Sequence, residues 1–232
     1  MSSKLERLLD ELIKLHPKYI DLSLKRLLVL LNKLDNPHLN LPPVIHIAGT
    51  NGKGSTLTYL KYILKENNFL VHSYISPHLE SINERFIISN KIIKKQQLLK
   101  TLSYVKKVND NKPITYFEIV TAAAFYLFSK NKADFTLLET GLGGRLDATN
   151  VITQSIINII TPISMDHKEF LGNSLTKITD EKLGIIKPFS CIIIGNQKQI
   201  VRNHIKKRMK KIKNKKLYFG EDFKIFNENK KI

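Results

Sequence analysis

The sequence predicts an α/β fold of three layers, in which a mostly parallel sheet lies between two layers of helices. Short apolar runs rich in β-branched residues alternate along the chain with longer stretches whose apolar residues recur at helical spacing. This alternation is typical of β-α-β units and a parallel sheet. In addition, the apolar run Val44 to Ala48 stops at a glycine-rich turn that leads directly into a helical stretch. A strand, a flexible turn and a helix in this order form a common anion-binding unit.

The elements follow from the spacing of apolar residues and from the positions of proline and glycine. Two amphipathic helices are expected before the first strand, because Leu5, Leu8 and Leu12 fall at helical spacing and residues 24–34 repeat the pattern after Pro17. After the glycine-rich turn we expect a helix through Leu64, strands at 69–75 and 84–88, a surface helix at 95–108, a buried helix at 116–128, strands at 135–138 and 156–160, a helix at 175–186, a strand at 191–194 and a final basic helix. Helices on both faces are expected to cover the sheet.

The turn GTNGKGST, from Gly49 to Thr56, has the composition of a phosphate cradle. Its glycines lack a Cβ, so the backbone N–H groups can approach an anion closely. Lys53 is placed to reach the outer phosphates, and a hydroxyl from Ser55 or Thr56 is placed to contact phosphate or magnesium. An extra glycine between the lysine and the hydroxyls departs from the strict G-x-x-x-x-G-K-[ST] pattern. We predict that the turn binds a nucleotide through Gly49, Thr50, Asn51, Gly52, Lys53, Gly54, Ser55 and Thr56.

The composition fits one soluble domain. The chain has 232 residues with 42% hydrophobic content, enough for one sizeable core. It contains neither an apolar run of membrane-spanning length nor the pattern of a secretory signal, so we expect a monomer in the cytoplasm with no membrane partner. The single cysteine, Cys191, lies in an apolar run and is expected to be a small buried side chain.

A net charge of +18 raises the alternative of a nucleic-acid-binding module, since residues 202–216 form a basic stripe. Two features argue against it. The chain has 32 Lys but only six Arg, whose planar guanidinium suits bidentate recognition, and no aromatic residues are interleaved with the basic ones for stacking. We therefore expect a solvated helix face and no nucleic-acid partner.

Polar residues stand where several predicted strands end. They are Ser76, Glu139, Asp147, Asp166, His167 and Lys182. In a parallel sheet the carboxyl ends of the strands share one edge, so these residues are expected near the phosphate turn. Magnesium prefers oxygen ligands and commonly takes one or two carboxylates together with substrate phosphates, which Glu139 can supply. Histidine is a less usual ligand of this ion.

Several motifs together resemble the folylpolyglutamate synthase and dihydrofolate synthase branch of the Mur ligase superfamily. They are GTNGKGST, SPHLESINER, TYFEIVTAAAF, ETGLGGRLDATN, the Asp166-His167 pair before LG, and EKLGIIK, in the order and approximate spacing of that family. The resemblance runs from about residue 21 to residue 195. It implies the fold of a Mur ligase central domain with its P-loop, ATP and Mg²⁺ as cofactors, and dihydropteroate or folate with L-glutamate as substrates.

The resemblance also implies roles for individual residues. Lys53, His167 and Lys182 would take part in catalysis, and Lys182 matches a lysine that family members carry as a carbamate. Magnesium would be held by Ser76, Glu139 and His167. The pteroate site would be lined by Thr115, Tyr116, Phe117, Glu118, Leu146, Asp147 and Ala148.

The family has a C-terminal domain that completes the ATP and amino-acid sites, and the resemblance does not extend to it. We therefore expect residues 1–220 to form the ATP-binding domain and residues 221–232 to begin the linker to that domain. The implied reaction is ATP-dependent amide formation through an acyl phosphate, with stand-alone activity in doubt. A related Mur-type ligase acting on a cell-wall precursor, and the basic nucleic-acid-binding module, stay open as alternatives.

Overall fold

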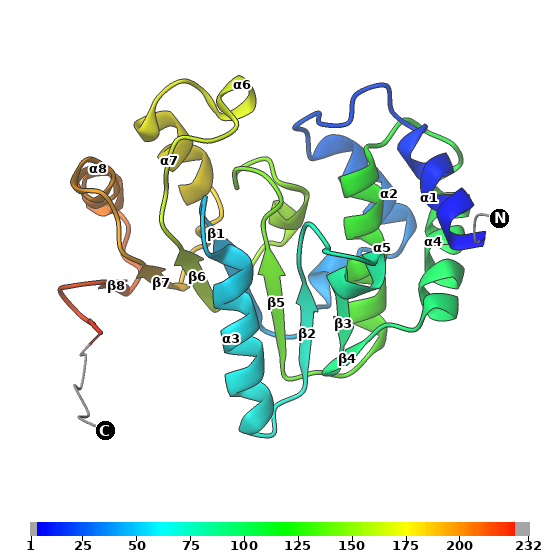
Figure 1. The fold of residues 1–232 in the computed structure, drawn as a ribbon, viewed down its shortest axis with the longest axis horizontal. Coiled ribbons are helices and arrows are strands. Elements are labelled where there is room, and N and C mark those ends of the chain that lie inside the picture. Colours follow the sequence, from blue (N-terminus) through cyan, green and yellow to red (C-terminus); the bar gives the residue numbers. More distant parts are fainter. Residues whose placement is uncertain (1–3, 226–232) are drawn as a thin grey trace.

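The computed structural model describes residues 4–225 and confirms the predicted α/β fold (Figure 1). One eight-stranded sheet has the order β4-β3-β2-β5-β1-β6-β7-β8. The strands β2, β5, β1, β6, β7 and β8 are parallel, whereas β3 and β4 pair antiparallel at one edge. The strands are β1 (Val44–Ala48), β2 (Val71–Tyr74), β3 (Phe86–Ile88), β4 (Lys91–Ile92), β5 (Phe135–Glu139), β6 (Ile157–Ile160), β7 (Cys191–Ile194) and β8 (Lys216–Tyr218).

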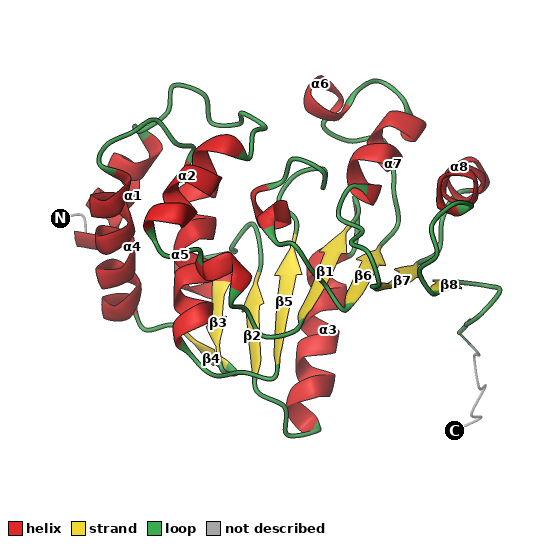
Figure 2. Ribbon diagram, turned by 180° about the vertical axis from the view of Figure 1, so that it is seen from behind, coloured by secondary structure: helices red, strands yellow, loops and turns green. Residues whose placement is uncertain are grey.

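Most helices lie on one face of the sheet, which we call the bundle face (Figure 2). The helices are α1 (Lys4–Ile13), α2 (Lys25–Lys33), α3 (Lys53–Glu66), α4 (Lys95–Asn109), α5 (Tyr116–Lys130), α6 (Lys168–Leu171), α7 (Leu175–Leu183) and α8 (Gln199–Met209), with short 3-10 turns at Pro37–Leu39, Ile82–Arg85 and Ala148–Val151. Helices α1, α2, α4 and α5 form one apolar core with β2, β3 and β5, and α6, α7 and α8 form a second with β6 and β7.

The opposite face carries α3 (Figure 1). This helix begins directly after the glycine-rich turn and packs on β1, β2 and β5. The alternation of side chains along β1 shows the two faces: Val44 and Ala48 belong to the cores of the bundle face, whereas Ile45 and Ile47 pack with Leu57 of α3. The carboxyl ends of β1, β5 and β6 therefore meet near the start of α3.

The helix expected on the surface at 95–108 is found as α4; one side of it is exposed, and the other buries Leu98, Leu102 and Val105. Strands β4 and β8 were not foreseen. After α8 the basic segment continues into β8. The Asn214 amide donates hydrogen bonds of 2.8 Å to the carbonyls of Lys187 and Ser190, and these bonds hold the segment beside β7.

Cys191 is partly exposed and not buried, because it lies on the α3 side of the sheet, where alternate residues of β6 and β7 are only partly buried. Among residues 4–225, the expected cover of both faces is therefore incomplete. None of the described helices has the length and apolar character needed to cross a membrane. The boundary expected at residue 220 stays a prediction, since residues 226–232 of the expected linker lie outside the described part of the chain.

Candidate active site

The turn between β1 and α3 requires glycine at its first position. Gly49 has φ +156°, and a Cβ built there would lie 1.8 Å from the Thr161 hydroxyl oxygen. The backbone of the turn therefore runs directly against the end of β6. Gly52 follows with φ +80° in the left-handed region and caps the start of α3.

The turn is anchored to the loop that follows β6. The backbone N–H groups of Thr50 and Asn51 both donate to the Pro162 carbonyl, at 3.0 and 3.2 Å. The Thr50 hydroxyl also donates to the Ser164 carbonyl and accepts from the Ser164 N–H. The first N–H groups of a helix have no acceptor within the helix, so those of Lys53, Gly54 and Ser55 are the donors that the turn offers to an anion.

Two lysines flank this turn. The Lys53 side chain is half-buried, and its ammonium lies 3.4 Å from the Thr50 carbonyl. The Lys182 ammonium comes from α7 and donates a 2.8 Å hydrogen bond to the Gly49 carbonyl. Phosphate oxygens placed at the start of α3 would lie close to positive charge on both sides.

Lys182 is only 4% exposed, and its pKa is lowered to about 8, chiefly by burial. The nearby charge of Lys53 contributes to this lowering, whereas Asp166 and Asp147 oppose it. A lysine on the surface of α7 would be expected to pair with its acidic neighbours on that helix, but Lys182 is buried and both neighbours pair elsewhere. Glu181 pairs with Arg145, and Asp180 pairs with His204 and Arg208.

Ser76 and Glu139 meet at the carboxyl ends of β2 and β5. The Ser76 N–H donates to the Glu139 carboxylate at 3.3 Å, and the Ser76 hydroxyl is buried without a hydrogen-bond partner. Burial raises the pKa of Glu139, and Lys53 opposes that shift. A carboxylate beside an unpartnered hydroxyl at the start of α3 fits a magnesium ion that takes its other ligands from phosphate and water.

His167 lies apart from Ser76 and Glu139 and is paired with neither of them among the described residues. It has φ +45°, its ring is 45% exposed, and its nearest acidic neighbour is Asp166 at 3.5 Å. Within residues 4–225 no three His, Cys, Asp or Glu side chains gather into a metal-binding group. Ser76 and Glu139 thus suit an ion that binds together with a nucleotide better than a metal that the protein holds by its own side chains alone.

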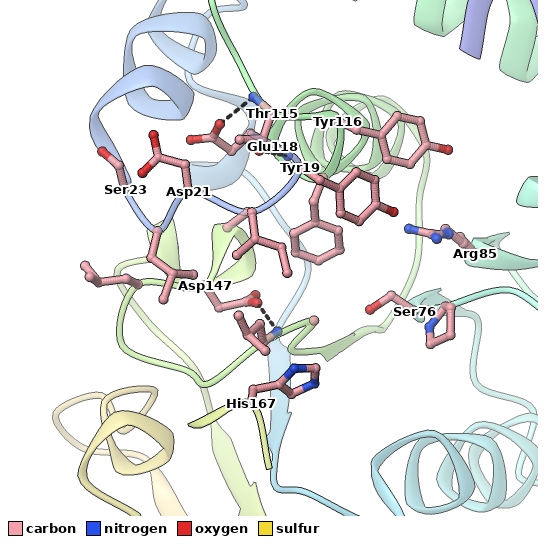
Figure 3. A pocket seen from close by; sticks show the side chains of 18 residues that line it. Tyr19, Asp21, Ser23, Ser76, Arg85, Thr115, Tyr116, Glu118, Asp147 and His167 are labelled. Atoms are coloured by element: carbon pink, nitrogen blue, oxygen red, sulfur yellow. Dashed lines mark hydrogen bonds between the residues drawn. The ribbon is translucent and has the colours of Figure 1, made fainter. Parts of the chain in front are cut away.

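A cavity of about 390 Å³ opens beside this edge of the sheet (Figure 3). It is lined by Tyr19, Ile20, Asp21, Leu22, Ser23, Ser76, Pro77, Arg85, Thr115, Tyr116, Phe117, Glu118, Gly141, Leu142, Leu146, Asp147, Ala148 and His167. Asp21, Ser23 and Glu118 stand at one end, whereas Arg85, Ser76 and His167 stand toward the other (Figure 3). One end therefore offers carboxylate acceptors, both paired with Arg26, and the other end carries the Arg85 cation.

A capping box at the start of α5 shapes the acidic end. The Thr115 hydroxyl accepts from the Glu118 N–H, and the Glu118 carboxylate accepts from the Thr115 N–H at 2.8 Å and from the Arg26 guanidinium at 3.2 Å. The second carboxylate oxygen of Glu118 is buried and has no hydrogen-bond partner. Such an orphaned acceptor is costly unless a ligand donates to it.

The cavity wall opposite is held by Asp147, a buried residue whose pKa is raised by burial. Its carboxylate accepts from the N–H groups of Leu142 and Thr149 and from the Thr149 hydroxyl. That hydroxyl accepts in turn from His46 of β1 at 2.8 Å. Burial lowers the His46 pKa to about 3, so the ring is neutral. The loop is thereby fixed to the strand that carries the phosphate turn.

Comparison with known proteins identifies the family. The model of the Mur ligase middle domain matches residues 47–231. The chain belongs to the Mur ligase family. It is 41% identical over 194 residues to the dihydrofolate synthase/folylpolyglutamate synthase of Haemophilus influenzae, which covers 84% of this chain and 44% of the relative. It is 40% identical over 198 residues to the dihydrofolate synthetase of Saccharomyces cerevisiae, covering 82% of this chain and 46% of the relative.

The solved structures with a similar fold are of the same kinds of enzyme as the sequence relatives. E. coli FolC in complex with DHPP and ADP has a TM-score of 0.88 at 30% identity, covering 97% of this chain and 54% of that protein. Mycobacterium tuberculosis folylpolyglutamate synthase complexed with ADP has a TM-score of 0.83 at 31% identity, covering 96% and 51%. This Mur ligase chain thus spans about half the length of the relatives that it matches.

The structure of the Mur ligase chain gathers most of the residues singled out in the sequence. All seven residues expected at the pteroate site line the cavity, and Ser76 and His167 line it as well. Glu139 contacts Ser76 but does not line the cavity, so it faces the phosphate turn. Their binding roles stay predictions.

Two parts of the cavity were missed by the sequence analysis. One is the loop from Tyr19 to Ser23, which has no motif of its own and reaches the site only through folding. The other is Arg85, the last residue of the SPHLESINER motif. Arg85 is 7% exposed, donates to the His78 ring at 2.9 Å and lies 5.9 Å from the Tyr116 ring. It forms no salt bridge with any residue in 4–225, and its motif was the available signal.

Proposed function

We propose that this chain is the ATP- and pteroate-binding half of a ligase that joins L-glutamate to dihydropteroate or folate. The observation that carries the proposal is the polarised cavity beside the phosphate turn. Support also comes from the relatives, which are dihydrofolate synthases and folylpolyglutamate synthases, and from a similar structure that contains DHPP and ADP. We expect it to act in the cytoplasm, as a monomer and without nucleic acid.

The polarity of the cavity matches the polarity of pteroate. The amino-pyrimidinone end of a pterin presents N–H donors, which suit the orphaned Glu118 oxygen and the Asp21 carboxylate. The flat ring system suits the aromatic walls of Phe117 and Tyr19. A Cβ on Gly141 would lie 2.6 Å from the Phe117 ring, so glycine is what allows this wall to form. The benzoate carboxylate then lies toward Arg85 and the phosphate turn.

The nucleotide is bound at the start of α3 in this proposal. The free N–H groups of Lys53, Gly54 and Ser55 and the Lys53 ammonium hold the phosphates, while Thr50 and Asn51 keep the turn in place. Glu139 and Ser76 would hold magnesium, with His167 nearby. When bound, magnesium would neutralise phosphate charge and orient the transferred group.

The chemistry is a double displacement. An oxygen of the pteroate carboxylate attacks the γ-phosphorus, the bond to the β-phosphate oxygen breaks, and ADP leaves. The neutral amine of glutamate then attacks the acyl carbon, phosphate leaves, and the nitrogen loses a proton to give the amide. The contribution of this chain is positioning and electrostatic stabilisation by Lys53, Arg85 and the α3 N–H groups.

Lys182 has the property that carbamate formation needs. Only a neutral amine reacts with carbon dioxide, and a pKa of about 8 leaves roughly a tenth of the side chain neutral at pH 7. We propose that Lys182 becomes carbamylated, which would turn a buried cation beside Gly49 into an anion. Carbon-13 NMR with labelled bicarbonate is the appropriate measurement, and absence of a carbamate signal at saturating bicarbonate would refute the modification.

Calorimetric titration at physiological salt tests the substrate. Dihydropteroate should bind, whereas a UDP-linked cell-wall precursor and single-stranded RNA should not. Arg85→Gln should weaken binding of dihydropteroate by about 10- to 100-fold, the value of one charged hydrogen bond. Binding of an analogue without the carboxylate should be unchanged by Arg85→Gln.

The matched control is Arg145→Gln, because Arg145 is exposed, pairs with Glu181 and lies outside the cavity. It should leave both affinities unchanged. If Arg85→Gln weakens both ligands equally, the proposed orientation of the pteroate is wrong. If the cell-wall precursor or RNA binds in place of dihydropteroate, the proposed function is wrong.

A further inference from the structure

Three buried side chains, His46, Thr149 and Asp147, form a chain of hydrogen bonds that ends at the cavity wall. His46 on β1 and Thr149 in the 3-10 turn after Asp147 are both fully buried, and Asp147 is 2% exposed. His46 Nε2 lies 2.8 Å from the Thr149 hydroxyl oxygen, which lies 2.5 Å from Asp147 Oδ1. Two directions of proton donation along this chain are conceivable, and they differ in the charge that they leave on Asp147.

The surroundings of the Asp147 carboxyl group reduce the choice to these two directions. Its Oδ1 atom accepts from the Thr149 N–H at 2.9 Å, and its Oδ2 atom accepts from the Leu142 N–H at 2.8 Å, the bond drawn at Asp147 in Figure 3. Both backbone groups are donors only. Among residues 4–225, the Thr149 hydroxyl oxygen is thus the one hydrogen-bond partner of this group that could accept a carboxyl proton.

In the forward direction, His46 donates from Nε2 to Thr149, and Thr149 donates to an ionised Asp147. The bonds from the backbone N–H groups of Thr149 and Leu142 are then charge-assisted, which makes them roughly twice as strong as bonds to a neutral acceptor. Burial raises the pKa of Asp147, whereas the bonds from Thr149 and Leu142 oppose that shift.

In the reverse direction, a protonated Asp147 donates to Thr149, and Thr149 donates to His46 Nε2. The proton of the neutral ring must then lie on Nδ1, which is buried and has no hydrogen-bond partner among the described residues. A buried N–H without an acceptor is costly, and both backbone bonds to Asp147 lose their charge assistance. The forward direction is therefore favoured.

His46 can take only one of the two states at a time. Burial lowers its pKa to about 3, with a contribution from the charge of Lys187, so the ring is neutral and has a single N–H. The position of that one proton therefore reports the direction of the whole chain.

We propose that His46 and Thr149 are positioning residues for substrate binding, which hold Asp147 as a carboxylate and thereby fix the cavity wall at Gly141 and Leu142. This role rests on the proposed function, in which the cavity binds pteroate. Asp147 anchors the Leu142 N–H, and a Cβ on the preceding Gly141 would lie 2.6 Å from the Phe117 ring. A small shift of this wall would therefore change the width of the cavity beside Phe117.

Nitrogen-15 NMR of the histidine rings reads the direction in the ligand-free chain. At pH 7 the His46 ring should be the neutral tautomer with its proton on Nε2 and an unprotonated Nδ1. The chain has seven histidines, and the signal of His46 is the one that disappears in His46→Gln. A neutral ring with its proton on Nδ1 would overturn the proposal.

Calorimetric titration with dihydropteroate and, separately, with ATP measures the consequence for binding. His46→Leu removes the donor and should weaken dihydropteroate binding by about tenfold, the value of one lost hydrogen bond in a buried network, with ATP binding unchanged. His46→Gln keeps an amide N–H that can reach Thr149 and should restore most of the affinity.

A double substitution tests whether the two residues act through one chain. Thr149→Val is nearly isosteric, removes the central hydroxyl and should also weaken dihydropteroate binding, whereas Thr149→Ser should restore it. Adding His46→Leu to Thr149→Val should cause little further loss, because both changes interrupt the same chain.

His72→Leu is the matched control. His72 is a second fully buried histidine, on β2, and its ring nitrogens are hydrogen-bonded to the Asn131 carbonyl and the Ser89 N–H, outside the cavity. Its replacement should lower stability and leave dihydropteroate affinity unchanged.

Unchanged dihydropteroate affinity in folded His46→Leu would overturn the proposal, and so would equal losses in His46→Leu and His72→Leu or equal losses for ATP and dihydropteroate. If His46→Leu fails to fold, the ring tautomer and the comparison of Thr149→Val with Thr149→Ser decide. Failure of the native chain to bind dihydropteroate would instead contradict the proposed function, a result that is distinct from native binding that the variants leave intact.

Discussion

Lys53 is the side chain on which nucleotide binding should depend most. It is half-buried beside the Thr50 carbonyl, and the N–H groups at the start of α3 lie next to it. Lys53→Ala should weaken ATP binding by about 10- to 100-fold, as expected for loss of a charged hydrogen bond, without unfolding the domain. Calorimetric titration with ATP and magnesium measures the change.

The control for this variant lies on the same helix. Lys65 is exposed near the end of α3, far from the turn, so Lys65→Ala should bind ATP like the native chain. An unchanged affinity in folded Lys53→Ala would mean that the glycine-rich turn is not the phosphate site.

Lys182 should make the stability of the fold depend on pH. Its pKa is about 8 in the folded chain and returns to its ordinary value of 10.5 on unfolding. Between these values the unfolded chain binds more protons, so the free energy of unfolding rises with pH, by roughly 3 kcal/mol at 1.36 kcal/mol per pKa unit. Below pH 8 Lys182 is charged in both the folded and the unfolded chain. Its burial then lowers the free energy of unfolding by an amount that does not change with pH.

Urea unfolding at pH values from 7 to about 10.5 checks this. The comparison is with Lys182→Met, which has a similar length and no charge. The native chain should gain stability relative to the variant across this range. Parallel pH profiles for the two proteins would show that Lys182 is not a buried, destabilised cation.

At the level of residues, short motifs predicted which segments gather at one edge of the sheet, whereas their binding roles stay predictions. The turn, the start of α5 and the loop at Asp147 each occupy a few consecutive residues, and the last two line the cavity. Tyr19 and Asp21 were missed because no local pattern reveals which distant loop closes a cavity. The burial of Lys182 was also invisible, since it depends on contact with Gly49, far away in the sequence.

At the level of elements, the capping box of α5 should link stability to the shape of the cavity. Thr115→Ala removes the acceptor for the Glu118 N–H and should lower the free energy of unfolding by about 1 kcal/mol. It should also weaken dihydropteroate binding, because the Thr115 hydroxyl fixes the Glu118 backbone and thereby the position from which its carboxylate reaches the cavity. Thr115→Ser should restore both properties.

The N-cap of α7 offers a comparison outside the cavity. The Ser174 hydroxyl accepts from the Lys177 N–H, so Ser174→Ala should cost a similar amount of stability and leave dihydropteroate binding unchanged. Equal losses of binding in Thr115→Ala and Ser174→Ala would show that the effect on binding comes from general destabilisation. Urea unfolding and calorimetry together separate the two cases.

The elements themselves were largely predictable because their apolar periods are strong. The strands β1, β2, β5, β6 and β7 and the helices α3, α4, α5 and α7 appear where the spacing placed them, within a few residues at their ends. The two-residue strand β4 and the strand β8 carry too few apolar residues for a periodic signal. Their positions depend on pairing with β3 and β7, which sequence spacing does not show.

At the level of the whole molecule, the fold class followed from the alternation of elements, but the completeness of the core did not. The apolar residues of β6 and β7 predict strands that are buried on both faces. They do not indicate which segments pack on each face. Only the structure shows that the α3 side of these strands is open.

Glutamate-dependent release of ADP, measured with ATP, magnesium and dihydropteroate, tests the central claim most directly. The 232-residue chain should bind ATP and dihydropteroate in calorimetric titrations yet release negligible ADP, because an incompletely enclosed site leaves the acyl phosphate unprotected and the amino-acid site unfinished. Fusion to the C-terminal half of a relative should produce ADP release that requires all three substrates. Efficient glutamate-dependent release by the 232-residue chain alone, or failure of that chain to bind either ligand, would contradict the account.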